Sequence, residues 1–296
     1  MNFVNDIVSR VGELQPLPGT VLRLIHLVND PRSSVDDIVE TIKYDQTVTS
    51  QMLRIANSAF FGFTREISSL SEALRVLGTL KVLQLVLAVH SNPLLARGQK
   101  GYGLEPGILW QHSVGVALAS AVLADRLRNP NRNLLFTAGL LHDIGKVILN
   151  EYVADEFARI AQMVTEQKTS FLEAEKQILG FSHDEIGALV GEKWKLPEGI
   201  ILGIRYHHEP EALDPPSPLV DILHLADCMC LMLGVGLGSD GLYYRASEHV
   251  TTRHGLREPD LEMLGAQVLI ELKRVESLFS EGSAGVAPGR AVARQE

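Results

Sequence analysis

Apolar residues recur at spacings of three and four along the first hundred residues, which is the period of an amphipathic α-helix. They form three runs: Val21, Leu24, Ile25 and Val28; Val48, Met52 and Ile55; and Leu70, Leu74 and Leu77. Ser34 stands three residues before Asp37, and Ser69 stands three before Glu72, the spacing of a capping box at a helix start. This part of the chain therefore predicts helices.

The helical periodicity returns after residue 110. Seven segments carry it: 111–127, 134–150, 151–167, 170–179, 184–193, 198–207 and 218–234. Neither part of the chain shows the alternation of apolar and polar residues that is typical of strands. The predicted fold class is all-α, with an N-terminal helical subdomain packed on a helical bundle.

The two parts differ in charge and are separated by a segment rich in glycine. Residues 1–105 contain ten acidic and ten basic side chains, whereas residues 106–296 contain 26 acidic and 17 basic ones. The segment 97–103, RGQKGYG, reads as a linker or long turn. We predict domains at 1–104 and 105–280, followed by a disordered tail at 281–296, where apolar content is too low for burial.

The composition narrows the class of protein. Of 296 residues, 46% are hydrophobic and 21% charged, as in globular proteins. A net charge of −9 without any run of Lys and Arg argues against direct nucleic-acid binding. The two cysteines, Cys228 and Cys230, are too few and too close for a disulfide framework. With no secretory signal and no uncharged apolar stretch of ~18 residues, we expect a cytoplasmic protein without membrane contact.

Candidate chemistry is concentrated in residues 139–149, GLLHDIGKVIL. There His142, Asp143 and Lys146 interrupt an otherwise apolar predicted helix. A buried carboxylate is costly unless it is paired or binds a metal, and imidazole with carboxylate is the ligand set of many transition-metal sites. Lys146 returns to the same helix face. It either pairs with Asp143 or contacts a substrate phosphate, in which case it is the candidate catalytic residue.

Five further side chains of ligand type lie on other predicted helices, and metal sites in bundles are built from facing helices. We therefore predict one or two transition-metal ions (Fe, Mn, Ni or Zn) held by His112, His142, Asp143, His183, His207, His208 and Asp227. The alternative is a buried hydrogen-bonded network without metal. We expect structural roles for Asn57, His90 and His224, and a surface position for His249 and His254.

Three segments carry a family resemblance: 14–18 (LQPLP), 52–62 (MLRIANSAFFG) and 68–78 (SSLSEALRVLG). Together with Asp45 they resemble the HDOD family, the HD-related output domain of bacterial signalling proteins. The order His112, His142-Asp143, Asp227 resembles the motif of the HD superfamily of metal-dependent phosphohydrolases. His183 and His207-His208 resemble the extended ligand set of its two- or three-metal branch. The likeness extends from about residue 14 to about residue 233.

The resemblance implies an HD-like helical bundle in the second part of the chain and a regulatory role rather than turnover. The expected function is bacterial signal transduction through contacts with a signalling protein. The alternatives are a metal-dependent phosphohydrolase or phosphodiesterase and a sensor that binds a nucleotide without cleaving it. In the cyclic-dinucleotide phosphodiesterase branch, His-His-Glu leads into an Arg-x-Asp-Gly-x-Gly-Tyr-Pro loop. Here residues 210–216, PEALDPP, follow instead, so hydrolysis of cyclic dinucleotides is not expected.

Overall fold

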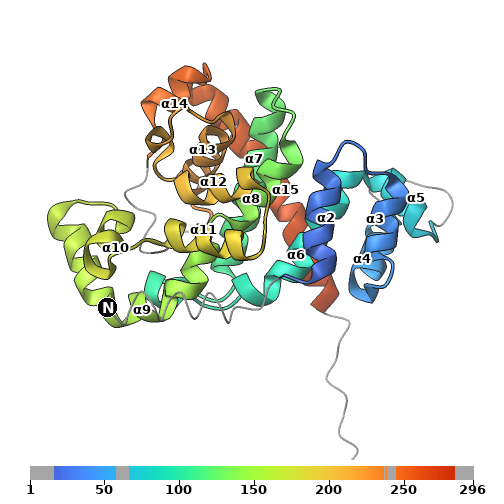
Figure 1. Ribbon diagram of the computed structural model, residues 1–296, viewed down its shortest axis with the longest axis horizontal. Coiled ribbons are helices and arrows are strands. Elements are labelled where there is room, and N and C mark those ends of the chain that lie inside the picture. Colours follow the sequence, from blue (N-terminus) through green and yellow to red (C-terminus); the bar gives the residue numbers. More distant parts are fainter. Residues whose placement is uncertain (1–16, 58–66, 237, 239–244, 284–296) are drawn as a thin grey trace, which may run out of the picture.

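The computed structural model describes residues 17–57, 67–236, 238 and 245–283. Within these ranges, all assigned secondary-structure elements are helices, apart from an isolated β-bridge between Gln99 and Leu104. The helices form a small group at one end of an elongated molecule and a larger group that makes up the rest (Figure 1). For the described residues, the prediction of an all-α fold is confirmed.

The N-terminal group consists of α2 (Gly19–Asn29), α3 (Val35–Ile42), α4 (Gln46–Ala56), α5 (Leu70–Leu77) and α6 (Thr79–Leu95). The predicted helix starts are found. The side chain of Ser34 accepts a hydrogen bond from the backbone of Asp37, and the Asp37 carboxylate accepts one in return from the backbone of Ser34. Ser69 accepts a hydrogen bond from the backbone of Glu72. These caps fix where α3 and α5 begin.

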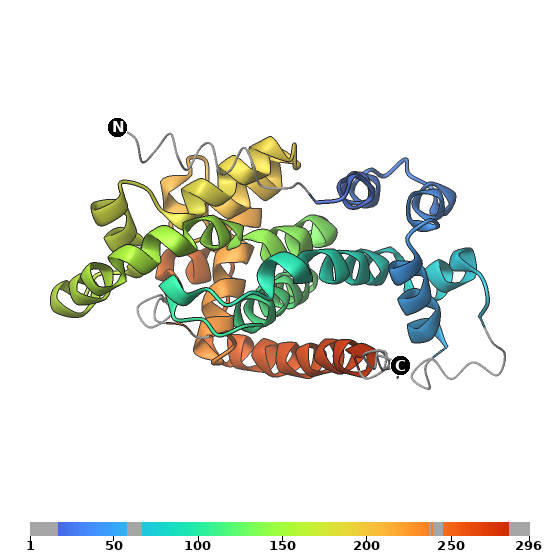
Figure 2. The same ribbon diagram turned by 90° about the horizontal axis from the view of Figure 1, so that it is seen from below.

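The larger group contains η1 (Lys100–Tyr102), α7 (Ile108–Arg126), α8 (Arg132–Leu141), α9 (Ile144–Gln167), α10 (Phe171–Leu179), α11 (His183–Lys193), α12 (Glu198–Tyr206), η2 (Pro210–Ala212), α13 (Pro218–Met232), α14 (Glu248–Arg253) and α15 (Glu258–Ser283). The pattern analysis did not predict α15, which lies along one side of the molecule and packs on α7 (Figure 2). It includes residues 281–283 of the predicted tail, while 284–296 lie outside the described residues.

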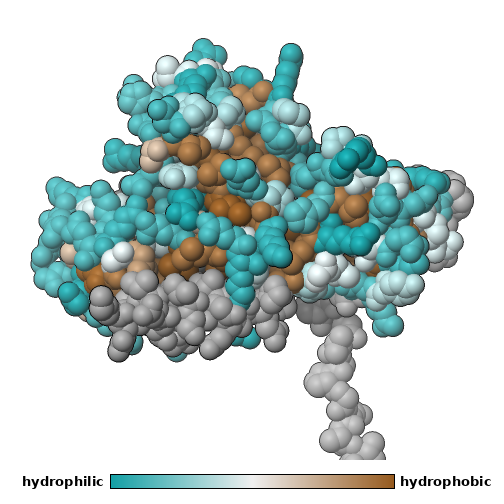
Figure 3. Space-filling model, in the orientation of Figure 1, coloured by the Kyte–Doolittle hydropathy of each residue, from teal (hydrophilic) through white to brown (hydrophobic). Residues whose placement is uncertain are grey.

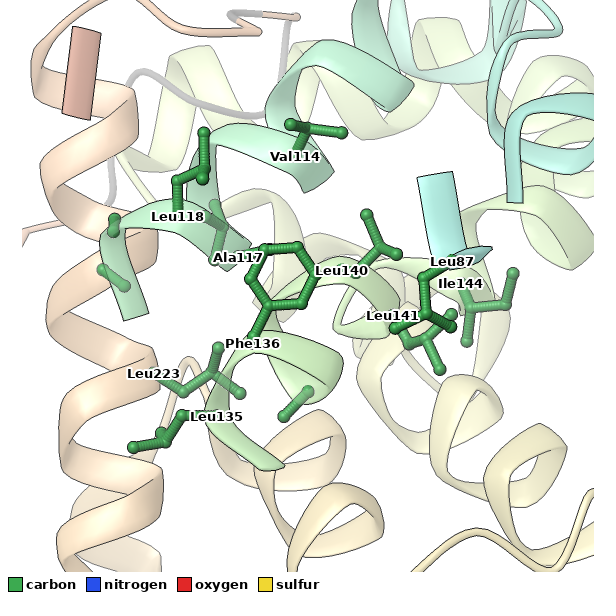
Figure 4. Packing of buried hydrophobic residues seen from close by; sticks show 14 of the residues in the cluster. Leu87, Val114, Ala117, Leu118, Leu135, Phe136, Leu140, Leu141, Ile144 and Leu223 are labelled. Carbon is green, nitrogen blue, oxygen red and sulfur yellow. The ribbon is translucent and has the colours of Figure 1, made fainter. Parts of the chain in front are cut away.

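The central helix is α7, which packs on α8, α13 and α15. Its side chains from Val114 to Ala124 are buried on every face of the helix, as in a helix at the centre of a bundle. The ring of Phe136 lies between Ala117 of α7 and Leu140 of α8 (Figure 4). Although α7 is long and apolar enough to cross a membrane, most of its length is buried inside the protein.

The prediction of a single helix over residues 134–150 is wrong. The helix is interrupted at His142 and Asp143: α8 ends before this pair, and α9 begins after it and continues to Gln167. The predicted boundary at residue 150 is therefore wrong as well. The break lets α8 pack on α7 and α9 pack on α11, which a straight helix could not do with one apolar face. It also places the two polar residues between the helices rather than along one of them.

The segment predicted as a linker, 97–103, is packed against the bundle. Gln99 and Tyr102 are buried, and the Asn150 side chain of α9 accepts a hydrogen bond from the backbone of Gly101. Asn57, at the end of α4, hydrogen bonds through its side chain to both backbone groups of Ile67. These hydrogen bonds are local and join the two residues that flank segment 58–66. That segment lies outside the described residues, as do residues 14–16 of the family motif.

A buried ion pair fastens α14 to α13. Both carboxylate oxygens of Asp221, which is fully buried, accept hydrogen bonds from Arg253 at 2.9 and 2.7 Å, and His254 contacts the same carboxylate. We expect Arg253→Ala to lower the free energy of unfolding by about 2 kcal/mol, because a buried acceptor loses its charged donor. Urea denaturation measures this. Arg257→Ala, an exposed arginine in the next turn, is the matched control and should change stability by less than about 0.5 kcal/mol.

Candidate metal centre

Close helix crossings bring the polar residues together. At the crossing of α8 with α7, a Cβ on Gly139 would lie 2.8 Å from the Cα of Ala117. At the crossing of α9 with α11, a Cβ on Gly145 would lie 1.8 Å from the carbonyl oxygen of His183. Only glycine permits backbones to approach this closely. The crossings therefore hold the break at His142 and Asp143 against α7 on one side and α11 on the other.

All seven residues predicted as ligands meet in one cluster. The side chains come from α7 (His112), the break between α8 and α9 (His142, Asp143), the start of α11 (His183), the end of α12 (His207, His208) and the middle of α13 (Asp227). Each of these side chains is 4% exposed or less. Since burial of so many polar groups is unfavourable without partners, the cluster requires a compensating interaction.

The cluster divides into two sets of ligand atoms that touch each other. In the first set, Asp143, His183, His207 and His208 each offer an atom within 4.8 Å of the others, and in the second set His112, His142 and Asp227 do the same. Asp143 faces both sets. Its Oδ1 lies 3.5 Å from His183 Nε2, and its Oδ2 lies 3.3 Å from His142 Nε2. This carboxylate is therefore placed to bridge two ions.

The imidazoles are oriented by hydrogen bonds at their outer nitrogens. The Nδ1 atoms of His112, His142 and His207 donate to the backbone carbonyls of Val235, Gly139 and Ile204 at 2.7 to 2.9 Å. A proton fixed on Nδ1 leaves the Nε2 lone pair directed into the cluster. Metal-binding histidines have this arrangement, with the second nitrogen donating to a carbonyl or a carboxylate.

Four buried atoms of the cluster have no hydrogen-bond partner within the described part of the chain. They are Nε2 of His142, Nε2 of His207, Oδ1 of Asp143 and Oδ2 of Asp227. Buried polar atoms without partners are rare in folded proteins, and these four belong to residues whose ligand atoms face one another. Two imidazole nitrogens and two carboxylate oxygens are a fitting donor set for first-row transition ions. The residues present therefore fit the metal that the sequence predicts.

Electrostatics inside the cluster follow from burial and from the neighbouring charges. Burial opposes ionisation of Asp143, but His142 and Lys146 outweigh it and hold the pKa of this carboxyl well below its usual range. The pKa of Asp227 is lowered in the same way by its hydrogen bond with His112 and by His142. Burial and the proximity of His142 lower the pKa of His207 to about 3. Both carboxylates are thus charged and His207 is neutral at physiological pH, as metal ligands must be.

Lys146 is nearly as buried as the ligands, and its Nζ lies 2.8 Å from Asp143 Oδ2. The two roles considered for this lysine are a salt bridge with Asp143 and a contact with a substrate phosphate. The salt bridge is present in the structure. The ammonium group also lies 5.6 Å from the centre of the Tyr102 ring, within the range of a cation–π contact. It therefore brings a positive charge to the edge of the cluster.

Sequence reasoning missed two residues that support His183. Glu175 of α10 is fully buried, and its Oε2 accepts hydrogen bonds from Nδ1 and from the backbone nitrogen of His183 at 2.7 and 3.0 Å. The hydroxyl of Tyr102 donates to the other oxygen of Glu175 at 2.6 Å. Although burial disfavours the charged imidazole, Glu175 outweighs it and raises the pKa of His183 to about 9, so binding of an ion at its Nε2 would release a proton from this imidazole. The apolar neighbours Ala174 and Leu172 gave no sign of this role.

Glu175→Gln should weaken metal binding by about 10- to 100-fold, because the variant loses the charge that orients and polarises His183. Tyr102→Phe, which removes only the hydroxyl donor, should have a smaller effect in the same direction. Isothermal titration with Mn²⁺ or Zn²⁺ measures both. Glu166→Gln, an exposed acid on α9, is the control and should bind like the wild type. Equal affinities for Glu175→Gln and the control would show that Glu175 has no part in positioning His183.

The other histidines have local roles. His90 pairs with Asp45 at 2.7 Å, and Asp45 also caps the first turn of α4. The His224 side chain donates through Nδ1 to the carbonyl of His207 and accepts from the backbone nitrogen of Ser247. His249 is exposed and contacts Glu211, while His254 contacts the buried Asp221. The interpretation of His254 as a surface residue is thus corrected, because it is largely enclosed beside α13.

The fold and the cluster together define a helical protein with an HD-type set of histidine and aspartate side chains. The family model of the HDOD domain matches residues 14–210, which is well over half of the chain. The chain therefore belongs to the HDOD family, and the resemblance found in the sequence is confirmed.

Three solved structures are similar over most of this chain. The first is an HDOD domain protein with unknown function from Geobacter sulfurreducens, 28% identical, with a TM-score of 0.71 over 93% of this chain and 99% of that one. The second is a "Putative signal transduction protein" from Marinobacter aquaeolei VT8, 25% identical, with a TM-score of 0.71 over 95% of this chain and 64% of that one. The third is a "Putative phosphohydrolase" from Shewanella amazonensis SB2B, 26% identical, with a TM-score of 0.66 over 89% of this chain and 93% of that one. The chain spans less than half of the length of the curated relatives it matches.

Proposed function

We propose that this chain is a cytoplasmic bacterial signalling protein of the HDOD type that acts through protein contacts and carries a two-ion transition-metal centre. The observation that carries the metal centre is the set of four buried ligand atoms without hydrogen-bond partners. One ion would be held by Asp143, His183, His207 and His208, and the other by His112, His142 and Asp227. Asp143 would bridge them through its two oxygens. Fe, Mn, Ni and Zn all suit nitrogen and oxygen donors.

The burial of the site favours a regulatory role over turnover. Ligand side chains that are 4% exposed or less leave little room for a substrate beside the ions. The two ions would together tie α7, α11, α12 and α13 to the break between α8 and α9, and their binding free energy would add to the stability of the bundle. On the outside, hydrophobic side chains gather near the middle of one face, around α11 and α12, among hydrophilic ones (Figure 3). The similarity to a "Putative signal transduction protein" supports the same role.

A second candidate function is metal-dependent hydrolysis of a phosphate ester, and the observation that favours it is the position of Lys146. Its ammonium group lies at the edge of the cluster, where it could bind a phosphate oxygen. A bound ion would act as a Lewis acid toward the phosphoryl group. The similarity to a "Putative phosphohydrolase" is consistent with this candidate.

Elemental analysis of protein purified without chelator tests the metal centre. We expect about two transition-metal ions per chain in the wild type and in His249→Ala, a control that removes an exposed histidine. His142→Ala should lose at least one ion, because the second set keeps only two ligands. If the wild type contained no ion even after anaerobic reconstitution with Fe or Mn, the metal centre and the hydrolase candidate would both be abandoned.

Activity measurements separate the two candidates. Bis(p-nitrophenyl) phosphate and a panel of nucleotides should not be turned over measurably by the metal-loaded wild type if the protein is purely regulatory. Hydrolysis that is present in the wild type and in His249→Ala but absent in His142→Ala would reverse the ranking. Hydrolysis that survives in His142→Ala would identify a contaminating enzyme.

A further inference from the structure

We propose that a cavity between α6, α7, α8 and α15 is a binding site for a small organic anion, with Lys81 as the residue that binds its phosphate or carboxylate group. The cavity has a volume of about 300 Å³ and none of its lining residues is a ligand of the metal centre. The inference therefore does not rest on the metal centre. It concerns a site where the N-terminal helices meet the HD-like bundle.

The cavity is lined by both apolar and polar side chains. Leu118 and Val122 of α7 and Leu77 of α5 are among the apolar ones, while Gln84 of α6 and Gln267 of α15 contribute side-chain amides. Neither amide makes a side-chain hydrogen bond within the described chain. A lining with this many polar and charged side chains suits a charged ligand rather than an apolar one, and the volume is at the low end of the ~300–1000 Å³ range of small-molecule sites.

Among the residues that the structure describes, the charges around the cavity leave one cation, Lys81, without a salt-bridge partner. Arg132 lies 2.9 Å from the carboxylate of Asp125, and Glu271 is paired with Arg274 at 2.6 Å. Lys81 lines the same cavity and is partly buried, yet it forms no salt bridge or hydrogen bond with any described residue. Asp125 and Glu271, the two acids that line the cavity, are each paired with an arginine. A half-buried ammonium group beside two amide groups is a suitable site for an oxyanion.

The electrostatic surroundings of Lys81 would favour a bound anion. Burial lowers the pKa of this lysine, the charge of Glu271 partly offsets the effect, and the nearby Arg274 and Arg132 lower it again. A bound phosphate or carboxylate would supply a negative charge and would therefore raise the pKa of Lys81. Since α6 contributes Lys81 and the HD-like bundle contributes the opposite wall, the anion would also join the two parts of the protein. Such a site could supply the input for a signalling protein.

Isothermal titration of the full-length, metal-loaded protein with sodium phosphate, sodium acetate and AMP tests the site. Four forms are compared: wild type, Lys81→Gln, Lys81→Arg and Lys273→Gln. Lys273 lies on the exposed face of α15 outside the cavity, so its replacement makes the same change of charge elsewhere. Ion content is measured for each form, so that a defect of the metal centre can be recognised separately.

We expect at least one of the three probes to bind the wild type and Lys273→Gln with equal affinity. Lys81→Gln should bind it at least ~10-fold more weakly, the loss typical of one hydrogen bond to a charged group, and Lys81→Arg should retain most of the affinity. If acetate alone binds, the site prefers a carboxylate. If sodium phosphate and AMP both bind, the site prefers a phosphate group. Equal binding to Lys81→Gln and wild type would overturn the proposal, because the anion would then occupy another site. Absence of binding by all three probes at 10 mM would overturn it as well.

Discussion

Gly145→Ala is expected to disrupt the metal centre without changing any ligand. The new Cβ would lie 1.8 Å from the carbonyl oxygen of His183 and 2.7 Å from the backbone nitrogen of Gly187, distances at which backbone atoms cannot yield locally. The helices α9 and α11 must then separate. Because Asp143 lies just before α9 and His183 begins α11, their separation withdraws the first set of ligands from one another.

The expected cost of Gly145→Ala is at or above the upper end of the ~1–3 kcal/mol that overpacking usually causes. Urea denaturation measures the loss of stability, and elemental analysis measures the loss of ions from the first set. Gly187→Ala should be milder, since its Cβ would lie 2.8 Å from the Ile204 side chain but no closer than 3.3 Å to a backbone atom. Gly19→Ala is the control, because no atom lies within 4 Å of its Cβ position. Wild-type stability and ion content in Gly145→Ala would contradict this account of the crossing.

The ligand cluster could be predicted from sequence because its members are unusual where they stand. His142, Asp143 and Asp227 are ionisable residues in apolar surroundings, and such residues are placed there only when the fold gives them partners. The pattern could not reveal that the chain turns at His142 and Asp143. Apolar residues continue on both sides of this pair, so the periodicity predicts one helix, and only the packing of α8 and α9 on different neighbours breaks it.

The supporting residues were missed for a different physical reason. Glu175 lies in an ordinary amphipathic helix that begins with a capping box at Ser170, and a glutamate in such a helix is most often on its solvated face, like the exposed Glu173. Its partner Tyr102 lies in a glycine-rich segment that reads as a linker. The hydrogen bond between Tyr102 and Glu175 joins positions 73 residues apart, and the one between Glu175 and His183 joins positions eight apart; both depend on tertiary structure alone. Residues whose role is to orient a ligand thus lack the local signal that the ligand has.

Asp143→Ala is expected to remove both ions, since this carboxylate faces ligands of both sets. Its Oδ1 lies 3.5 Å from His183 Nε2 and its Oδ2 lies 3.7 Å from His112 Nε2. The substitution also deprives the buried Lys146 of its salt bridge at 2.8 Å. Breaking a buried pair by removing one partner typically costs about 3 to 5 kcal/mol. Asp143→Ala should therefore be both less stable and free of metal.

Asp143→Asn separates the two effects. The amide keeps the shape of the side chain and one oxygen, but it lacks the negative charge that holds a transition ion and attracts Lys146. We expect it to fold with a smaller loss of stability and still to lose most of the bound metal. Asp155→Ala, an exposed acid on α9, should match the wild type in ion content and in urea denaturation. Two ions per chain in Asp143→Asn would show that the carboxylate does not bridge the ions. The second ion would then be held by His112, His142 and Asp227 alone.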